Sequence, residues 1–233
     1  LDLIEFILDF DDVEFNPLLK ESGAAEIESI IKKTGVSVRT VCADYFMEAP
    51  LHSNDNKVAE DSFKVLERLL ETARVLKISD IVIPCVDQSS LKTKEAVDRF
   101  VKQISKIIPT IEKENINLSL ETDLAPKPFI ELLNKLNSKN ITVNYDIGNS
   151  ASLGYNPTEE LEIYGDRISD IHIKDRTLDG GPVVLGEGDA DFDSFFNALS
   201  KIDYHGPFIM QAYRDEEGIS IFKSQLDWVK RYL

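Results

Sequence analysis

The sequence predicts an α/β protein in which parallel strands alternate with helices, as an open sheet or a (β/α) barrel. Two observations predict it. Apolar runs of strand length alternate with amphipathic, helix-length segments along all 233 residues. In addition, four of the expected strands end in a polar residue, at Glu121, Asp146, His172 and Gln211. Because the carboxyl ends of parallel strands meet at one edge, we expect these side chains to converge.

The intervals between these polar strand ends fit the repeat of a barrel. They are 25 residues (121 to 146), 26 residues (146 to 172) and 39 residues (172 to 211). A barrel of eight strand–helix units has roughly 30 residues per unit. The spacing therefore indicates one unit per interval, with an insertion in the last.

Each expected element follows from its local pattern. Short apolar runs predict seven strands, at 3–10, 36–43, 78–85, 115–121, 141–146, 168–173 and 208–211. Periodic apolar positions predict helices at 24–33, 57–76, 94–114, 127–136, 159–163, 191–200 and 221–232. Thr158 is expected to cap the fifth helix, and Pro109 to kink or break the third. No linker or composition break interrupts the chain, so we expect residues 1–233 to form a single domain.

Composition excludes several partners. The net charge of −16 would repel the phosphates of nucleic acids and anionic membranes. Two cysteines make no disulfide framework, which favours a reducing compartment. No apolar run approaches the ~20 residues of a membrane span, and we expect a cytoplasmic protein.

Four motifs resemble the sugar isomerase/epimerase family of xylose-isomerase-like TIM barrels. They are ETD at 121–123, YDIGN at 145–149, HIKD at 172–175 and GEGDADF at 186–192. The resemblance covers nearly the whole chain and implies a TIM-type (β/α) barrel of parallel strands. The run 3–6 then matches the second strand of the family, so the first strand is expected to be missing from this chain.

The resemblance also implies one divalent metal ion, which family members bind with Glu, Asp, His and Glu. Glu121, Asp146 and His172 match the first three ligands, whereas Gln211 stands in the fourth position and offers an amide oxygen. Such oxygen and nitrogen donors suit Mn²⁺, Mg²⁺ or Co²⁺, with Zn²⁺ as an alternative. The ion would make a proton next to the carbonyl of a sugar or sugar phosphate acidic.

Because Gln211 replaces a carboxylate, the residues do not decide between several types of reaction. Epimerisation needs two proton-transfer groups, and an amide cannot be one of them. Glu121 is the expected base, with Lys174 or Glu5 as its partner. Isomerisation, or dehydration of a keto-polyol, needs a single base and fits the chain equally well. A catalytically impaired sugar-binding homologue is the third hypothesis.

Further polar residues are expected at the substrate. Arg176 and Arg214 lie where they could grip a phosphate or carboxylate, although a surface salt bridge explains them equally well. Asn149 and Asn144 flank Asp146 and could orient it or contact substrate. We also expect substrate contacts from Glu5, His52 and Glu187. A homo-oligomer is compatible with the sequence but is not indicated by it.

Overall fold

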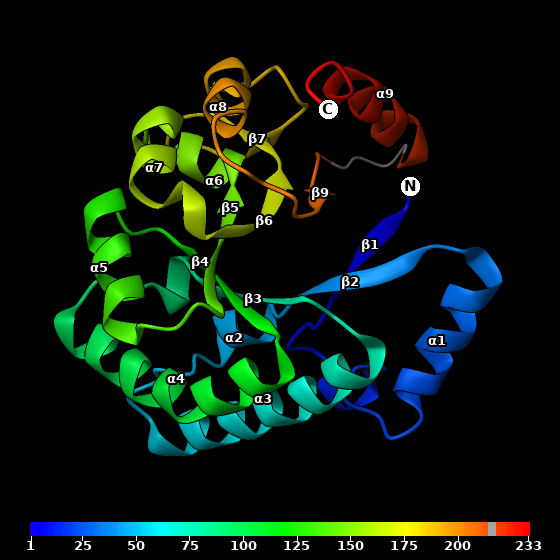
Figure 1. Cartoon of the computed structure of the whole chain (residues 1–233), viewed down its shortest axis with the longest axis vertical. Helices are drawn as coiled ribbons and strands as arrows, with labels where there is room; N and C mark the ends of the chain where they lie inside the picture. Colours follow the sequence, from blue (N-terminus) through cyan, green and yellow to red (C-terminus); the bar gives the residue numbers. More distant parts are fainter. Residues whose placement is uncertain (214–217) are drawn as a thin grey trace. The chain divides into compact units, whose positions relative to one another are not determined.

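Figure 1 shows the computed structural model of the chain, which describes residues 1–213 and 218–233. The chain folds as two compact units. The first comprises Leu1–Leu124 with Pro128–Thr142, and the second comprises Ala125–Lys127 with Val143–Leu233. Strand β5 (Ile141–Asp146) begins in the first unit and ends in the second.

The first unit alternates strands and helices as the sequence predicts. Its elements are β1 (Leu3–Ile7), η1 (Val13–Phe15), α1 (Gly23–Thr34), β2 (Ser37–Cys42), α2 (Tyr45–Glu48), α3 (Asn56–Leu76), β3 (Asp80–Cys85), η2 (Asp87–Ser89), α4 (Lys94–Glu114), β4 (Asn117–Thr122) and α5 (Pro126–Leu136). Strands β1 to β4 pair in parallel in chain order. Asn140, just before β5, accepts a hydrogen bond from the Leu118 N–H at 2.8 Å, so the start of β5 lies beside β4.

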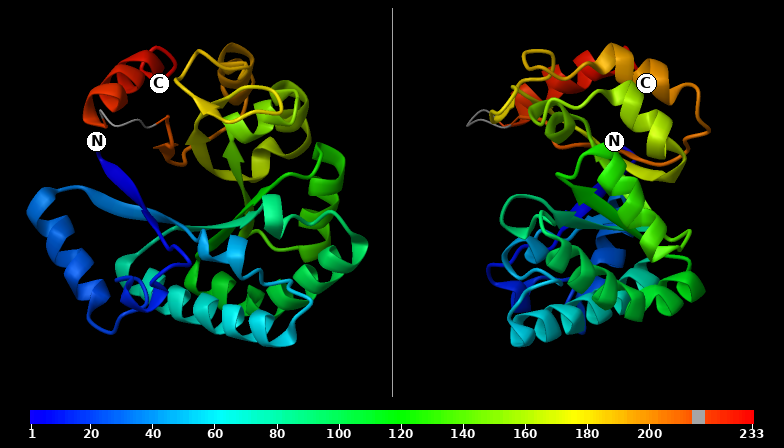
Figure 2. Two further views of the ribbon diagram at one scale, coloured as in Figure 1. Left: turned by 180° about the vertical axis from the view of Figure 1, so that it is seen from behind. Right: turned by 90° about the vertical axis from the view of Figure 1, so that its left-hand side faces the viewer.

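Two long helices cover this sheet, and Figure 2 shows them side by side. The Asp55 carboxylate caps α3 by accepting from Lys57 N at 2.8 Å, and the Thr93 hydroxyl caps α4 by accepting from Ala96 N at 3.2 Å. Both helices turn one apolar stripe to the strands, as their three- and four-residue spacing predicts. The buried side chains of these stripes are Leu66, Leu69, Leu70, Ala73, Phe100, Ile104, Ile107 and Ile111.

The second unit continues the alternation. After β5 it contains α6 (Ile147–Ser152), α7 (Pro157–Tyr164), η3 (Gly165–Arg167), β6 (Ile168–Ile173), β7 (Asp175–Arg176), β8 (Pro182–Val183), α8 (Phe192–Leu199), β9 (Phe208–Met210) and α9 (Ile219–Val229). Strands β5, β6 and β9 are parallel neighbours in that order. The short strands β7 and β8 form a separate antiparallel pair.

The seven predicted parallel strands are all present in the described part of the chain, but two local expectations were wrong. Helix α6 follows β5 directly, where no helix was expected. Asn156, not Thr158, caps α7, because its side-chain oxygen accepts from Thr158 N and Glu159 N. Pro109 lies inside α4 without breaking it. Among the helices of residues 1–213 and 218–233, none has the length and apolarity of a membrane span.

A buried carboxylate ties α6 and α7 to β5. Glu160 on α7 is 3% exposed and accepts hydrogen bonds from Tyr145 and Tyr164, both at 2.7 Å, and from the Ser150 hydroxyl. Burial raises the pKa of Glu160, and the three hydroxyl donors oppose that rise. Folding therefore favours the neutral acid at this position.

We expect Glu160→Gln to flatten the dependence of stability on pH. Because the folded-state pKa of Glu160 lies above its ordinary value of 4.5, its contribution to stability is fully present below that pH and is lost as the pH rises through the raised pKa. Urea unfolding from about pH 4 to about pH 8 measures this as a steeper fall in the free energy of unfolding for the wild-type protein than for the variant. Glu162→Gln, an exposed residue on the same helix, is the matched control, and parallel curves for wild type and Glu160→Gln would contradict the expectation.

Candidate functional site

The strand ends of the second unit bring polar side chains together. In β5 successive side chains point to opposite faces, so Asn144 and Asp146 share one face and Tyr145 takes the other. Asp146 is the register partner of His172 on β6. Two of the four polar strand ends predicted from the sequence, Asp146 and His172, are thus direct neighbours on adjacent strands.

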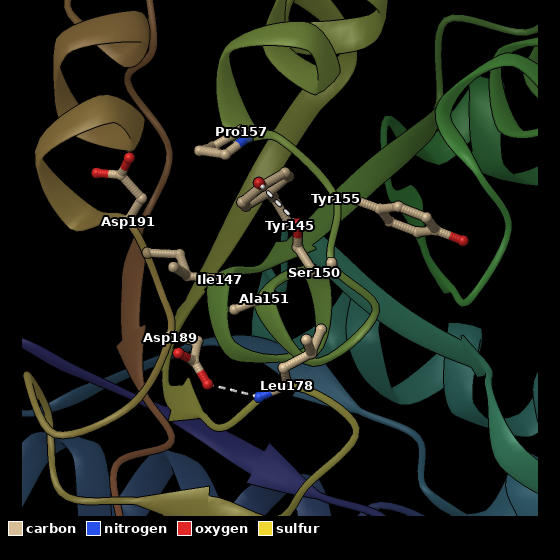
Figure 3. Close-up of a pocket in the computed structure, with 10 residues that line it drawn as sticks. Tyr145, Ile147, Ser150, Ala151, Tyr155, Pro157, Leu178, Asp189 and Asp191 are labelled. Atoms are coloured by element: carbon tan, nitrogen blue, oxygen red, sulfur yellow. Dashed lines mark hydrogen bonds between the residues drawn. The ribbon is translucent and has the colours of Figure 1, made fainter.

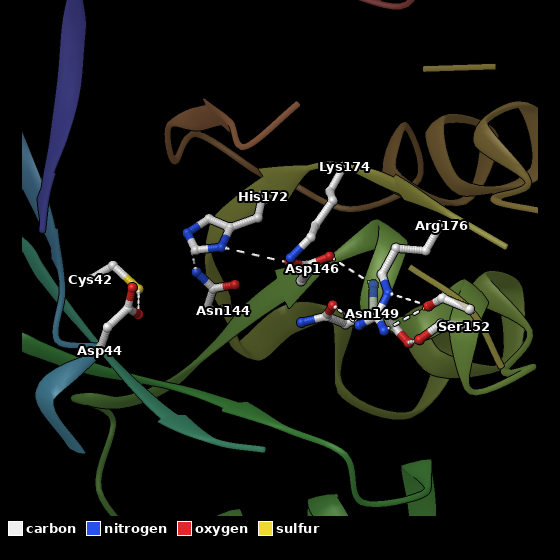
Figure 4. Close-up of polar contacts among 10 residues, drawn as sticks. Cys42, Asp44, Asn144, Asp146, Asn149, Ser152, His172, Lys174 and Arg176 are labelled. Atoms are coloured by element: carbon white, nitrogen blue, oxygen red, sulfur yellow. Dashed lines mark hydrogen bonds and ion pairs between the residues drawn. The ribbon is translucent and has the colours of Figure 1, made fainter. Parts of the chain in front are cut away.

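The two oxygens of Asp146 have different partners (Figure 4). Oδ1 accepts a hydrogen bond from Asn149 N at 2.8 Å and caps α6. Oδ2 lies 3.4 Å from the Lys174 ammonium and 4.0 Å from His172 Nδ1. The side chains of Asp146 and His172 are 1% and 0% exposed, so this group is held away from bulk water.

Asp146 and His172 are donors of the kind that divalent ions bind. A carboxylate oxygen and an imidazole nitrogen lie side by side here, and a shared ion would draw on both. Gln211 follows β9, and its backbone N–H donates to Ile173 O at 3.1 Å, which places it at the neighbouring strand end. Glu121 closes β4 in the first unit and is 8% exposed. That Glu121 joins these residues at one ion stays a prediction.

A glycine makes room for Lys174. A Cβ atom added to Gly148 on α6 would lie 2.9 Å from Lys174 Cγ and 3.1 Å from its backbone carbonyl carbon. The lysine stem therefore packs directly against the α6 backbone. This contact holds the ammonium group beside Asp146, and it explains the glycine in the YDIGN motif.

The GEGDA loop folds around a carboxylate of the chain itself. Asp175 is fully buried and accepts from the backbone N–H groups of Gly186 at 2.8 Å, Gly188 at 3.0 Å and Ala190 at 3.2 Å. The two intervening N–H groups donate to Val184 O and Arg176 O. All five N–H groups from 186 to 190 are thereby engaged. Sequence reasoning missed this role of Asp175, which follows His172 in the HIKD motif.

Among the remaining predicted substrate residues, Arg176 and Asn149 are engaged in structural hydrogen bonds. Arg176 donates to Gly180 O from Nε at 3.0 Å and from Nη2 at 2.7 Å, and to Asn149 Oδ1 at 2.8 Å, which closes the β7–β8 hairpin against α6. Glu187 is exposed, and Glu5 is half-buried on β1 of the first unit. Arg214 lies outside the described residues. Their contacts with a substrate remain predictions.

The comparisons with known proteins assign the family. Residues 1–232 match the family described as the xylose isomerase-like TIM barrel. The chain belongs to this family. The TIM-type fold and the family expected from the four motifs are therefore confirmed.

Individual similarities agree with this assignment. The chain is 27% identical over 203 residues to the putative L-ribulose-5-phosphate 3-epimerase SgbU of Haemophilus influenzae, covering 81% of this chain and 70% of that protein. In structure it resembles a D-tagatose 3-epimerase-like protein, with a TM-score of 0.81 and 20% identity over 100% of this chain and 88% of that one. It also resembles the IOLI protein with a bound zinc atom, with a TM-score of 0.79 and 20% identity over 100% of this chain and 89% of that one.

The described pocket of this xylose isomerase-like chain lies away from Asp146. It is a cavity of about 230 Å³ in the second unit, lined mainly by α6 and by the segments on either side of it (Figure 3). Tyr145 lines it, and Tyr145 faces the opposite side of β5 from Asn144 and Asp146. The Asp189 carboxylate at this pocket accepts a hydrogen bond from Leu178 N at 2.7 Å and so joins the segment before α8 to the segment after β7. We place the candidate site at Asp146 rather than at this pocket, because the strand ends bring a carboxylate, an imidazole and an ammonium group together.

His52 is more deeply packed than the prediction of a substrate contact suggests. It is 7% exposed, its ring lies edge-on to Phe100 at 5.9 Å, and its backbone oxygen accepts from Arg99 Nε at 2.8 Å. Burial, assisted by the charge of Arg99, lowers the pKa of His52 to about 4. The imidazole is therefore neutral in the folded protein near pH 7.

We expect the His52 ring to titrate near pH 4, well below its ordinary value of 6.5. Since folding favours the neutral ring, its contribution to stability is present above pH 6.5 and is lost as the pH falls toward 4. Imidazole chemical shifts followed by NMR measure the midpoint of His52 directly. Arg99→Gln should raise the His52 midpoint by removing the nearby charge. A wild-type midpoint near 6.5 would contradict the burial of His52.

Proposed function

We propose that this protein is a metal-dependent epimerase or isomerase of a ketose or ketose phosphate. The observation that carries the proposal is the Asp146 carboxylate, which faces His172 Nδ1 at 4.0 Å and the Lys174 ammonium at 3.4 Å on adjacent strand ends. A carboxylate, an imidazole and an ammonium group provide metal ligands and a proton-transfer group in one place. The similarity to proteins named as L-ribulose-5-phosphate 3-epimerases supports a pentulose phosphate as the substrate class.

Four residues would hold the ion in this proposal. Asp146 and His172 supply an oxygen and a nitrogen within the second unit, and we assign Glu121 and the amide oxygen of Gln211 as the remaining ligands. The bound ion would polarise the ketose carbonyl and stabilise the negative charge of an enediolate. Mn²⁺, Mg²⁺ and Co²⁺ suit these donors, and the zinc of the similar IOLI structure supports Zn²⁺ as an alternative.

The proton transfers fall to the residues of the chain. For 3-epimerisation, we assign Glu121 to remove the proton on C3, next to the C2 carbonyl, and the Lys174 ammonium to return a proton on the opposite face. Glu121 thereby ends protonated and Lys174 neutral, and exchange with water restores both.

Gln211 favours a second candidate reaction. Aldose–ketose isomerisation moves one proton between adjacent carbons on a single face, so one base suffices. In that reaction Glu121 would carry the proton, and Lys174 would bind the substrate oxygens. The amide of Gln211 is compatible with this role because it need only bind, and never ionise.

The proposal also covers the domain organisation, the cellular compartment and the substrates of the protein. We propose a single barrel domain that acts in the cytoplasm on small-molecule substrates in carbohydrate metabolism. The net charge of −16 means that an anionic substrate needs local positive groups, of which Lys174 is one.

We expect Asp146→Asn to abolish turnover while preserving the fold. Asn caps helices as well as Asp does, so α6 keeps its N-cap, but the metal site loses a negative ligand. Mn²⁺ affinity measured by calorimetry should fall by on the order of 100-fold. Deuterium uptake from D₂O into a panel of ketoses and ketose phosphates should fall by about 1,000-fold or more. Asp189→Asn, at the separate pocket, is the control, and undiminished deuterium uptake in Asp146→Asn would refute the proposed site.

Gln211→Glu separates the candidate roles of the amide. If the wild-type enzyme uses the amide as a neutral ligand, the added carboxylate should tighten Mn²⁺ binding and lower the rate of deuterium uptake by about 10-fold or more. An inactive wild-type protein that becomes an active epimerase in Gln211→Glu would instead identify a catalytically impaired homologue. Product analysis by NMR distinguishes epimerised from isomerised sugar in both proteins.

A further inference from the structure

Asn144 contacts the imidazole of His172 from the side opposite to Asp146. Asn144 lies on β5, is 3% exposed, and its Nδ2 atom is 2.8 Å from His172 Nε2 (Figure 4). His172 Nδ1 faces Asp146 Oδ2 at 4.0 Å. Each nitrogen of the buried His172 ring therefore faces one side chain of β5, and these two side chains, Asn144 and Asp146, lie on the same face of the strand.

The orientation of the Asn144 amide decides which ring nitrogen carries the proton. If Nδ2 donates to Nε2, the proton of the neutral ring lies on Nδ1, the atom that faces Asp146. If the amide is rotated by 180°, Oδ1 accepts from Nε2–H and the lone pair lies on Nδ1. The nitrogen and oxygen of an amide have nearly the same shape, so both orientations keep the 2.8 Å contact.

Two observations favour the rotated orientation. With Nδ2 toward the ring, Asn144 Oδ1 is buried and has no hydrogen-bond partner among the residues of 1–213 and 218–233, which is a costly arrangement for a carbonyl oxygen. In addition, the register partner of Asn144 on β6 is Asp170, which is fully buried. A carboxylate on the neighbouring strand can accept a hydrogen bond from an amide N–H but not from a second oxygen.

We propose that Asn144 is a positioning residue that accepts a hydrogen bond from His172 Nε2–H and so keeps the lone pair on Nδ1, toward Asp146. A divalent cation binds only an imidazole nitrogen that carries no proton, and a partner on the other nitrogen fixes this tautomer. The inference deepens the proposed function, because it rests on the role of His172 as a metal ligand. It assigns the choice of ligating atom to a residue that touches neither substrate nor ion.

The tautomer can be read in the metal-free protein. Long-range proton–nitrogen NMR spectra separate the two neutral tautomers, and the chain has three histidines, so His52→Gln and His205→Gln variants assign the spectrum. Wild-type His172 is expected to show the Nε2–H tautomer. Asn144→Asp, which can only accept a hydrogen bond, should keep it, whereas Asn144→Leu should give a mixture. A wild-type ring protonated on Nδ1, or an unchanged ring in Asn144→Leu, overturns the inference.

Metal affinity gives a second readout. Mn²⁺ alone, titrated by calorimetry, should bind Asn144→Leu about 10- to 100-fold more weakly than wild type and should bind Asn144→Asp at least as tightly. Asn140→Leu is the matched control, because Asn140 is an equally buried amide that donates to Ile116 O in the first unit. If Asn144→Leu fails to fold, Asn144→Asp still tests the proposal, since loss of the Nε2–H tautomer in that variant contradicts it.

The two proposals fail in different ways. A wild-type protein that binds no Mn²⁺ but shows the Nε2–H tautomer refutes the metal-dependent function and supports the Asn144–His172 hydrogen bond. A protein that binds Mn²⁺ while His172 carries its proton on Nδ1 refutes the role of Asn144 and leaves the proposed reaction intact.

Discussion

The candidate site depends on one residue that is both the end of a strand and the start of a helix. Asp146 closes β5, and its Oδ1 atom caps α6, so that its Oδ2 atom is held toward His172 and Lys174. An N-cap contributes about 0.5–2 kcal/mol, which is enough to keep a six-residue helix in register with the strand. Rotation of the carboxylate away from the imidazole would break this cap. The geometry of the site is thus coupled to local stability.

The sequence predicted the repetitive part of the fold well. Strands and long helices have a periodic apolar pattern, and α4 begins and ends where the pattern places it. The polar residues at the ends of β5 and β6 also identified the neighbouring pair Asp146 and His172. These predictions succeeded because burial imposes a period on the sequence.

The parts that could not be predicted have no such period. Helix α6 has the sequence IGNSAS, which is too short and too polar for an amphipathic stripe, and it exists because Asp146 caps it and β5 supports it. The hydrogen bonds of Asp175 to the GEGDA loop join residues that are 11 to 15 positions apart, through a conformation that no local propensity encodes. The tertiary fold, rather than the local sequence, determines both.

An amide at position 211 changes the charge balance of the proposed ligand set. Glu121 and Asp146 together carry two negative charges, which one divalent ion would neutralise, whereas a third carboxylate would leave the set anionic. A neutral set repels an enediolate or a phosphate less than an anionic one does. In a chain with a net charge of −16, this difference favours an electron-rich substrate.

The buried carboxylate of Asp175 has a consequence for anion binding in this barrel. It lies within a ring of backbone amides that would otherwise be a ready receptor for phosphate. A covalently attached group acts at an effective concentration in the millimolar range or above, so a freely diffusing anion competes poorly for the same donors. The side chain of Asp175 thus occupies the place that a bound anion would take. For the proposed phosphorylated substrate, recognition would therefore fall to cationic side chains, which single substitutions can add or remove without remaking the loop.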